Sequence, residues 1–348
     1  MPEKQTAVTL KDLASATGFS TMTVSYVLRG ERNFPQRTKE KVFAAARRLG
    51  YRPNLHAVSL AGARTGSKTM EFPLGLLIWT PEQKGTSRAK YKEAFPNALI
   101  TRALGLNARE MGFHLYEHEF RSSEELPRLL KSLFFKGVRG LLIGSIPGVK
   151  WPSGIDWGRF SVVTFDQMDS HPLFHSVGKD VFSMVMNTCD EVAARGYRRI
   201  GAALCRHQFR ILEDDSREGA LLRFQTSLAK RSHAIPPFLG EHNDESGFLE
   251  WFRQHRPDAV IAFSVFQYYA LKSAGYSIPG DVAFVSLLND PETDGEVASL
   301  SGSDCLVAKT ALHLMDSLIR HHQVGMPEFP ETVLVQPKFQ PGRTLPGC

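Results

Sequence analysis

Cysteine is scarce in this chain of 348 residues, and the four that occur (Cys189, Cys205, Cys305 and Cys348) lie far apart. Because none forms a Cys-x-x-Cys pair, the sequence argues against a zinc site or a disulfide framework and fits a reducing compartment. No apolar run approaches the roughly 20 residues that span a bilayer. The N-terminal stretch also lacks the apolar core of a secretory signal. We therefore expect a cytoplasmic protein with no membrane partner.

Catalytic and cofactor motifs are also missing from the sequence. It contains no Gly-x-Ser-x-Gly, no phosphate-binding Gly-x-x-x-x-Gly-Lys, no dinucleotide fingerprint after a strand and no His-Glu-x-x-His. The pair His321-His322 stands at the end of a predicted helix, where solvated cations are favoured, so we read it as a surface feature rather than as a metal site. The sequence thus predicts no enzyme activity, no cofactor and no metal.

Positive charge is confined to one end of the chain. Residues 1–68 hold 12 Lys and Arg against 4 Asp and Glu, whereas the remainder holds 30 against 32. An excess of eight charges over so short a segment points to a polyanionic partner for that end. A solvated basic tail is the alternative, but such a tail would have no helical periodicity.

The basic end is patterned as three helices. Thr9 can cap a first helix with Asp12 in its first turn, Gly18 suits a turn, and Ser20 can cap a second helix. A third helix is expected from about Pro35 to Leu49. The inward positions of the three helices are Leu10, Leu13, Ala14, Val24, Val27, Leu28, Val42, Ala45, Ala46 and Leu49. This is a helix-turn-helix pattern, in which the second helix can enter the major groove of DNA.

The ordered run Val8-Thr9-Leu10-Lys11-Asp12-Leu13-Ala14, Gly18-Phe19-Ser20, Thr23-Val24-Ser25 and Leu49-Gly50-Tyr51-Arg52-Pro53-Asn54 resembles the lactose-repressor (LacI) family of bacterial transcription regulators. The resemblance implies that Thr21, Met22 and Tyr26 contact bases. It implies phosphate contacts for Thr9, Ser20, Thr23, Ser25 and Arg29. Tyr26 departs from the arginine that many members carry. Burial of Met22 and Tyr26 against a neighbouring domain is the alternative.

The resemblance also covers a short segment after the three helices. Pro53 can open a further helix of about two turns, too short to be stable alone in water. In the family this is a hinge helix that enters the minor groove, which implies minor-groove roles for Asn54, Ala57 and Leu60. Leu60 matches a leucine wedge that kinks the duplex. Leu60 could also pack against the hinge of a second subunit.

From Leu74 onward, apolar runs alternate with amphipathic stretches, which predicts parallel sheets covered by helices on both faces. These alternating strand and helix units are too many for one small sheet and therefore favour two lobes. We predict an N-terminal all-α helix-turn-helix domain (1–52), a hinge helix and linker (53–72), and a two-lobed α/β core of doubly wound parallel sheets (73–348) that resembles periplasmic binding proteins. The expected N-lobe is 73–165 with 296–325, and the expected C-lobe is 166–295 with 326–348.

Ligands of such folds bind at the carboxyl ends of the strands, between the lobes. The predicted effector residues are Trp79, Thr80, Asp166, Arg217, Asn289 and Asp290. The family resemblance supports Asp166 and the pair Asn289-Asp290, and it supports Arg217 more loosely, because the spacing to Gly219 is one residue short. Trp79 could instead be a core aromatic, and Asp166 and Asp290 could cap loops.

The sequence therefore predicts a homodimeric, sequence-specific DNA-binding regulator, expected to be a repressor, that recognises a pseudo-palindromic operator. A small effector such as a sugar would bind in the core. One alternative is a sugar-binding or sugar-modifying protein with an incidental basic end. Another is an architectural DNA-bending protein, which would not need a two-lobed core of this size.

Overall fold

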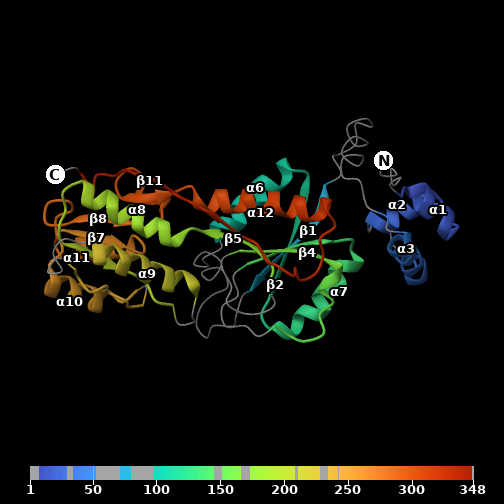
Figure 1. Cartoon of the computed structure of the whole chain (residues 1–348), viewed down its shortest axis with the longest axis horizontal. Helices are drawn as coiled ribbons and strands as arrows, with labels where there is room; N and C mark the ends of the chain where they lie inside the picture. The colour runs from blue at the N-terminus through green and yellow to red at the C-terminus, as the bar shows by residue number, and fades with distance from the viewer. Residues whose placement is uncertain are drawn as a thin grey trace.

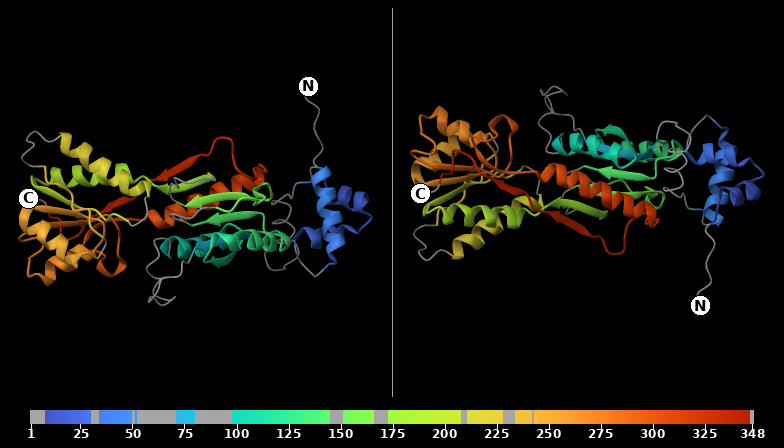
Figure 2. Two further views of the ribbon diagram at one scale, coloured as in Figure 1. Left: turned by 90° about the horizontal axis from the view of Figure 1, so that it is seen from below. Right: turned by 90° about the horizontal axis from the view of Figure 1, so that it is seen from above.

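The computed structural model of the chain describes residues 8–29, 34–49, 51, 71–79, 98–144, 151–165, 173–207, 211–227, 234–241 and 243–346. Three parts follow one another along the long axis of the molecule (Figure 1). A small helical domain lies at one end, a six-stranded sheet with its helices lies in the middle, and a five-stranded sheet lies at the other end. Two further views show the same order (Figure 2).

The helical domain consists of α1 (Leu10–Thr17), α2 (Thr21–Arg29) and α3 (Gln36–Leu49). Its buried cluster contains Leu13, Val24, Val27, Val42 and Ala45. The other predicted inward residues, Leu10, Ala14, Leu28, Ala46 and Leu49, pack around this cluster and are partly buried. The periodicity therefore predicted the three helices and their inward faces correctly.

The first lobe is built on a parallel sheet in the order β10-β5-β4-β3-β1-β2. Its elements are β1 (Phe72–Trp79), α6 (Ala98–Glu110), β2 (Phe113–Phe120), η1 (Ser123–Glu125), α7 (Leu126–Phe135), β3 (Gly140–Ile143), η2 (Trp157–Arg159), β4 (Ser161–Phe165), β5 (His175–Lys179), α12 (Ser303–Arg320) and β10 (Thr332–Val335). Separate apolar clusters cover the two faces of the sheet. The central strands β3 and β4 are consequently buried along their whole length.

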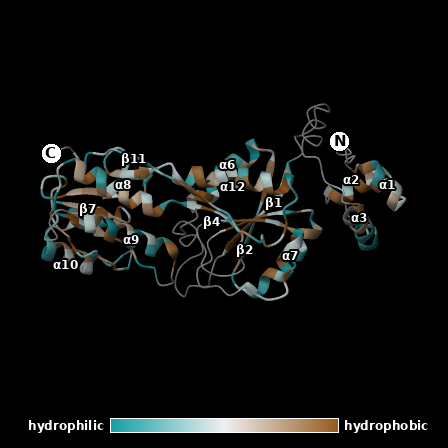
Figure 3. Ribbon diagram, viewed as in Figure 1, coloured by the Kyte–Doolittle hydropathy of each residue, from teal (hydrophilic) through white to brown (hydrophobic). Residues whose placement is uncertain are grey.

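The second lobe is built on a sheet in the order β11-β9-β8-β7-β6. Its elements are α8 (Val181–Ala194), β6 (Ile200–Ala203), α9 (Leu212–Ser227), α10 (Glu245–His255), β7 (Ala259–Ala262), α11 (Phe266–Ser273), β8 (Ala283–Ser286), η4 (Pro291–Thr293), β9 (Ala298–Ser301) and β11 (Lys338–Gln340). Four strands are parallel, and the edge strand β11 is antiparallel. Again two apolar clusters lie on the two faces. Colouring by hydropathy shows the same pattern, with apolar strands and polar outer helix turns (Figure 3).

The lobe boundaries differ from the predicted ones. The strand β5 pairs with β4, so the chain first crosses between lobes after Lys179 rather than at residue 165. The strand β9 pairs with β8, which moves the second crossing from residue 296 to about Gly302. The third crossing separates β10 from β11 and lies near Gln336, not at residue 325. These crossings are determined by four short strands, β5, β9, β10 and β11, of three to five residues each. Strands so short give little apolar period to predict from the sequence.

The three crossings are joined by polar contacts. Lys179 forms an ion pair with Asp304 at 2.8 Å, which connects the first crossing to the start of α12. Asp180 accepts a hydrogen bond from the Gln336 side-chain amide at 3.2 Å, which connects the first crossing to the third. Hydrogen bonds from Gln336 and Ser183 keep the pKa of Asp180 below its ordinary value, although its partial burial acts in the opposite direction. The three connections between the lobes are therefore joined to one another by side-chain contacts.

Candidate nucleic-acid interface and ligand edge

The first helix of the DNA-binding candidate begins at a capping box. The Thr9 backbone N–H and hydroxyl each donate to the Asp12 carboxylate at 2.7 Å. These two hydrogen bonds lower the pKa of Asp12, so the carboxylate stays ionised at the positive end of α1. The prediction that Thr9 caps this helix is confirmed. Because its single hydroxyl proton is donated to Asp12, Thr9 would have to release that bond to donate to a phosphate.

The second helix starts directly after a tight turn. Gly18 closes α1 with φ of +74°, a left-handed conformation that glycine adopts without strain. The Ser20 hydroxyl then accepts a hydrogen bond from the Thr23 backbone N–H at 3.0 Å, and the two hydroxyls lie 2.9 Å apart. Ser20 therefore caps α2 as predicted. Ser20 thus satisfies the Thr23 amide, whereas the Thr21 and Met22 amides have no intrahelical acceptor by geometry, which suits them to bind an anion such as a phosphate.

The outward face of α2 carries the predicted base-reading residues. Thr21 is exposed, and Met22 has 63% of its surface accessible, a high value for a large apolar side chain. Ser25 and Tyr26 are half-buried at the edge of the same face. The alternative that Met22 is buried against a neighbouring domain is therefore wrong. Arg29 ends α2, and its side chain lies outside the described part of the structure.

The ligand edge, defined here as the carboxyl ends of β6, β7 and β8 in the second lobe, contains a buried arginine. Arg217, on α9, is only 4% exposed. Its guanidinium forms an ion pair with Asp214 and lies 4.7 Å from the ring centroid of Phe263, which directly follows β7. Within the described residues, the Nε of Arg217 has no hydrogen-bond partner. A buried donor without a partner is costly, so this atom is suited to meet an acceptor from a ligand.

Asp214 is held ionised by its neighbours. Burial raises its pKa, but hydrogen bonds from His207 and the Arg217 cation outweigh burial and keep the pKa below its ordinary value. The His207 backbone N–H donates to this carboxylate at 2.8 Å, and the imidazole Nδ1 lies 3.0 Å from it. The His207 ring also contacts Phe263 with a centroid distance of 5.7 Å. The sequence analysis missed His207 and Phe263, although both follow strands of this sheet and the strand-end rule could have found them.

The predicted pair Asn289-Asp290 follows β8 at the same edge. Asn289 accepts a hydrogen bond from the Ser299 hydroxyl at 3.1 Å. Asp290 accepts one from the Glu292 backbone N–H at 2.9 Å and so caps η4. The loop-capping role considered for Asp290 is thus present in the structure. Since both side chains are half-buried, neither capping nor packing removes them from contact with a ligand.

The predicted residues of the first lobe are only partly described. Trp79 ends β1 and packs against the apolar cluster that includes Leu77 and Phe120, as the core-aromatic alternative expected. Thr80 and Asp166 lie outside the described residues, so the structure does not place them. Among the predicted effector residues, those that the structure places at the ligand edge therefore all belong to the second lobe.

A family model described as "Bacterial regulatory proteins, lacI family" matches residues 9–54, the helical domain just described. Over a much longer stretch, the chain is 25% identical to catabolite control protein A of Staphylococcus epidermidis, covering 81% of this chain and 82% of the relative. The helical domain is therefore a lacI-type domain. The hinge candidates Asn54, Ala57 and Leu60 lie outside the described residues.

Solved structures of lacI-type regulators share the fold of this chain over nearly its whole length. A transcriptional regulator CelR–cellobiose complex aligns with a TM-score of 0.60 at 20% identity, covering 97% of this chain and 99% of that one. The Lac repressor dimer bound to operator and the anti-inducer ONPF aligns with a TM-score of 0.58 at 18% identity, covering 98% and 99%. At these identities the likeness establishes the fold: a helix-turn-helix domain followed by a two-lobed α/β core.

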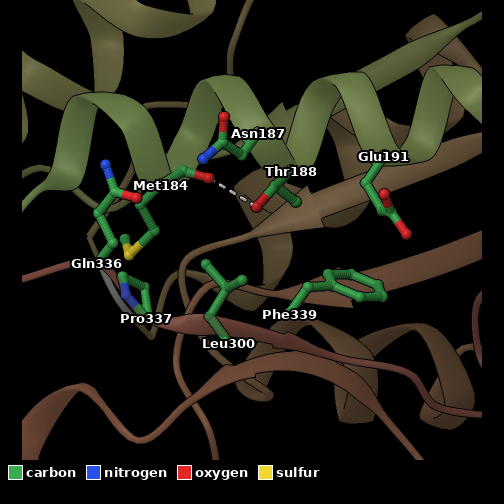
Figure 4. A pocket seen from close by; sticks show the side chains of 8 residues that line it. All are labelled: Met184, Asn187, Thr188, Glu191, Leu300, Gln336, Pro337 and Phe339. Atoms are coloured by element: carbon green, nitrogen blue, oxygen red, sulfur yellow. Dashed lines mark hydrogen bonds between the residues drawn. The ribbon is translucent and has the colours of Figure 1, made fainter.

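A cavity of about 160 Å³ lies between α8 and the link from β10 to β11 (Figure 4). Several of its polar groups have protein partners. The Thr188 hydroxyl donates to the Met184 carbonyl at 2.7 Å, and Glu191 pairs with Arg195 at 2.6 Å. The floor is apolar and includes Leu300. These contacts give the cavity no unsatisfied donor comparable to the Nε of Arg217 among the groups just named.

Metal and membrane sites were searched over the same part of the chain. Among the described residues, no three His, Cys, Asp or Glu side chains gather closely enough to hold a metal ion. In that part of the chain, no helix combines the length and the apolar character needed to cross a bilayer.

Proposed function

We propose that this protein is a transcriptional repressor that binds a specific DNA operator through α2 and releases or tightens it in response to a small effector. The observation that carries the proposal is the outward face of α2. Exposed Thr21 and Met22 stand beside the capped, anion-ready start of a helix inside a basic domain. In this proposal Thr21, Met22 and Tyr26 contact bases, whereas Thr9, Ser20, Thr23, Ser25 and Arg29 contact phosphates.

The operator is proposed to be a pseudo-palindrome bound by a homodimer. Two copies related by a twofold axis present two recognition helices to successive major grooves, about one helical turn apart. Asn54, Ala57 and Leu60 would enter the minor groove between the half-sites. The operator-bound dimer named for the structurally similar Lac repressor supports this arrangement.

The effector is proposed to be a sugar or a related polyol. The Arg217 Nε and the carboxylate of Asp214 offer a donor and an acceptor to hydroxyl groups, and Phe263 offers a ring for the C–H face of a sugar. The cellobiose complex named for the structurally similar CelR supports a carbohydrate. The effector alters operator binding only if it binds the two lobe arrangements with unequal affinity.

The proposed function is tested by mapping where the protein sits on the chromosome of its own cell, by cross-linking and immunoprecipitation. A regulator occupies a small number of sites that share one pseudo-palindromic sequence, and it vacates or fills them when the carbon source changes. Broad occupancy without a shared sequence would instead support an architectural protein. No enrichment under any growth condition would support a sugar-binding or sugar-modifying protein without regulatory binding.

The minor-groove role of Leu60 has its own test. Leu60→Ala removes the wedge that stabilises the kinked operator, so specific affinity is expected to fall at least tenfold while non-specific affinity changes little. Competition binding against selected and random duplexes at one stated salt concentration measures both quantities. An equal loss for both duplexes would contradict the wedge role.

A further inference from the structure

A cluster of aromatic and arginine side chains connects the DNA-binding domain to the core. Phe43 lies on α3, and its ring centroid is 5.7 Å from that of Phe134 on α7, with an angle of 43° between the planes. The guanidinium carbon of Arg139 lies 5.0 Å from the centroid of the same Phe43 ring. Figure 2 shows α3 on the side of the helical domain that faces the first lobe. Phe43 is therefore in contact with two residues of the first lobe.

The core side of this contact is fixed by its own bonds. Arg139 donates to the Phe134 carbonyl at 2.9 Å and to the Val138 carbonyl at 2.8 Å. The Phe134 carbonyl lies at the carboxyl end of α7, where the helix dipole favours a cation. The guanidinium also lies 4.0 Å from the Phe134 ring. Because main-chain carbonyls and a ring hold Arg139, its planar group is already oriented toward the position that Phe43 occupies.

A second arginine supports the Phe134 ring. The guanidinium of Arg159 lies 4.8 Å from that ring and pairs with Asp156 at 2.5 Å. Burial, together with the nearby Arg159 charge, lowers the pKa of Arg139 to about 10. Arg139 therefore remains cationic at neutral pH and can attract the electron-rich face of Phe43.

The position of Phe43 leaves the reading face of the domain open. Phe43 is half-buried next to the inward residue Val42 and packs at the margin of the three-helix cluster. On α2, Thr21 and Met22 stay exposed while this contact is made. The contact between α3 and the core thus orients the domain without covering the residues proposed to read bases.

We propose that the DNA-binding domain docks on the first lobe of its own chain through Phe43, which is clasped between Phe134 and Arg139. The docking holds α2 at a set orientation to the core in the DNA-free protein. Arg139 directly precedes β3, and Arg159 stands two residues before β4. A rotation of the first lobe therefore carries the clasp and the domain together. The docking rests on these contacts alone and not on the identity of the operator or the effector.

The direct test is nitrogen-15 relaxation of the deuterated full-length protein without DNA. If the domain is docked, amides of α1, α2 and α3 have the same transverse relaxation rates as amides of the core, because both tumble as one body. If those amides instead relax several-fold more slowly than the core, as a small domain tumbling alone does, the docking is refuted for the wild-type protein without the need for any variant.

Two variants weaken the clasp from opposite sides. Phe43→Leu keeps an apolar side chain on α3 but removes the ring, and Arg139→Leu removes the cation. Each loss is expected to reduce the docked population roughly fivefold to tenfold, so the transverse rates of α1–α3 fall toward those of a free domain while core rates stay unchanged. Unchanged domain rates in both variants would overturn the proposal.

Matched controls separate docking from folding. Arg128→Leu removes an exposed arginine from the same helix α7, and Phe34→Leu alters another ring that packs on the three-helix cluster. Both controls are expected to keep wild-type relaxation rates. The dispersion of the α1–α3 amide signals reports whether the domain of each variant is folded, and a folded domain with reduced rates is the outcome that supports the clasp.

Discussion

The helical domain and the α/β core place their functional residues in opposite ways. In the helical domain a small buried cluster leaves the functional face of α2 exposed, with Met22 open to solvent. In the second lobe the functional candidate Arg217 is almost fully buried and is held by an ion pair and an aromatic ring. A surface that reads DNA needs accessible side chains, whereas a site for a small ligand needs desolvated, oriented groups. A substitution on the exposed face of α2 is therefore expected to change DNA recognition with little loss of stability. A substitution of a buried ligand-site residue is expected to change both ligand binding and stability.

The largest effect is expected from Arg217→Met, which leaves the Asp214 carboxylate buried without its cation. Such a loss costs about 3–5 kcal/mol of stability when one partner of a buried pair is removed. It also removes the proposed effector donor. Calorimetry of the full chain is expected to show a lowered core transition, and a thermal-shift screen with sugars and polyols is expected to show no ligand response.

Arg206→Met is the matched control for that variant. Arg206 is largely exposed and pairs with Glu218, the residue that follows Arg217 on α9. Its stability cost is expected to stay below about 1 kcal/mol. If both variants lost equal stability, the burial of Arg217 would have no special energetic role.

Leu13→Ala is expected to have the next largest effect, confined to the helical domain. Leu13 is fully buried in the three-helix cluster, and truncation of a buried leucine costs about 2–5 kcal/mol. Since the cluster is small, the domain unfolds well below the core and operator binding is lost. Circular dichroism and calorimetry together would reveal two separate transitions. A single shifted transition would show that the two regions unfold as one unit.

Acid sensitivity is expected to distinguish Asp214 from exposed carboxylates. Its pKa is lowered from an ordinary value of 3.8 in the folded protein, so it stabilises the fold above about pH 4. That contribution is lost as the pH falls through the lower, folded-state pKa. Denaturant titrations between pH 7 and pH 2.5 are expected to show a shallower acid loss for Asp214→Asn than for the wild type. Identical pH profiles would contradict the ionised state assigned to Asp214.

The smallest effect on stability is expected from Met22→Ala. Because Met22 is exposed, the free energy of unfolding is expected to change by no more than about 0.5 kcal/mol. Base preference at one position of each operator half-site is nevertheless expected to change, since an apolar contact to a base edge is removed. Sequencing of duplexes bound by the variant measures the preference, and an unaltered preference would exclude base contact by Met22.

The helical domain was largely predictable from the sequence because its contacts are local. Thr9 with Asp12, Gly18, and Ser20 with Thr23 each act within a few residues, so spacing alone reveals them. The apolar period then determines which faces meet.

The core was predictable in its element types but not in its lobe boundaries. The strand β5 and the edge strand β10 pair over 156 positions of sequence, as Ser176 with Thr332 shows, and no local pattern encodes such a pairing. His207 reaches Asp214 and Phe263 because three separate segments meet at one sheet edge. The ligand edge therefore depends on tertiary contacts that the family resemblance indicated only for Arg217, Asn289 and Asp290.

Selection of bound duplexes from a random DNA pool tests most directly whether this chain reads a specific DNA sequence as a dimer. The purified full-length protein is used at a fixed salt concentration of about 150 mM, because phosphate contacts make affinity steeply dependent on salt. We expect enrichment of one pseudo-palindrome with a flexible central step. Absence of any enriched sequence, both in buffer and with metabolites from a cell extract, would contradict this expectation.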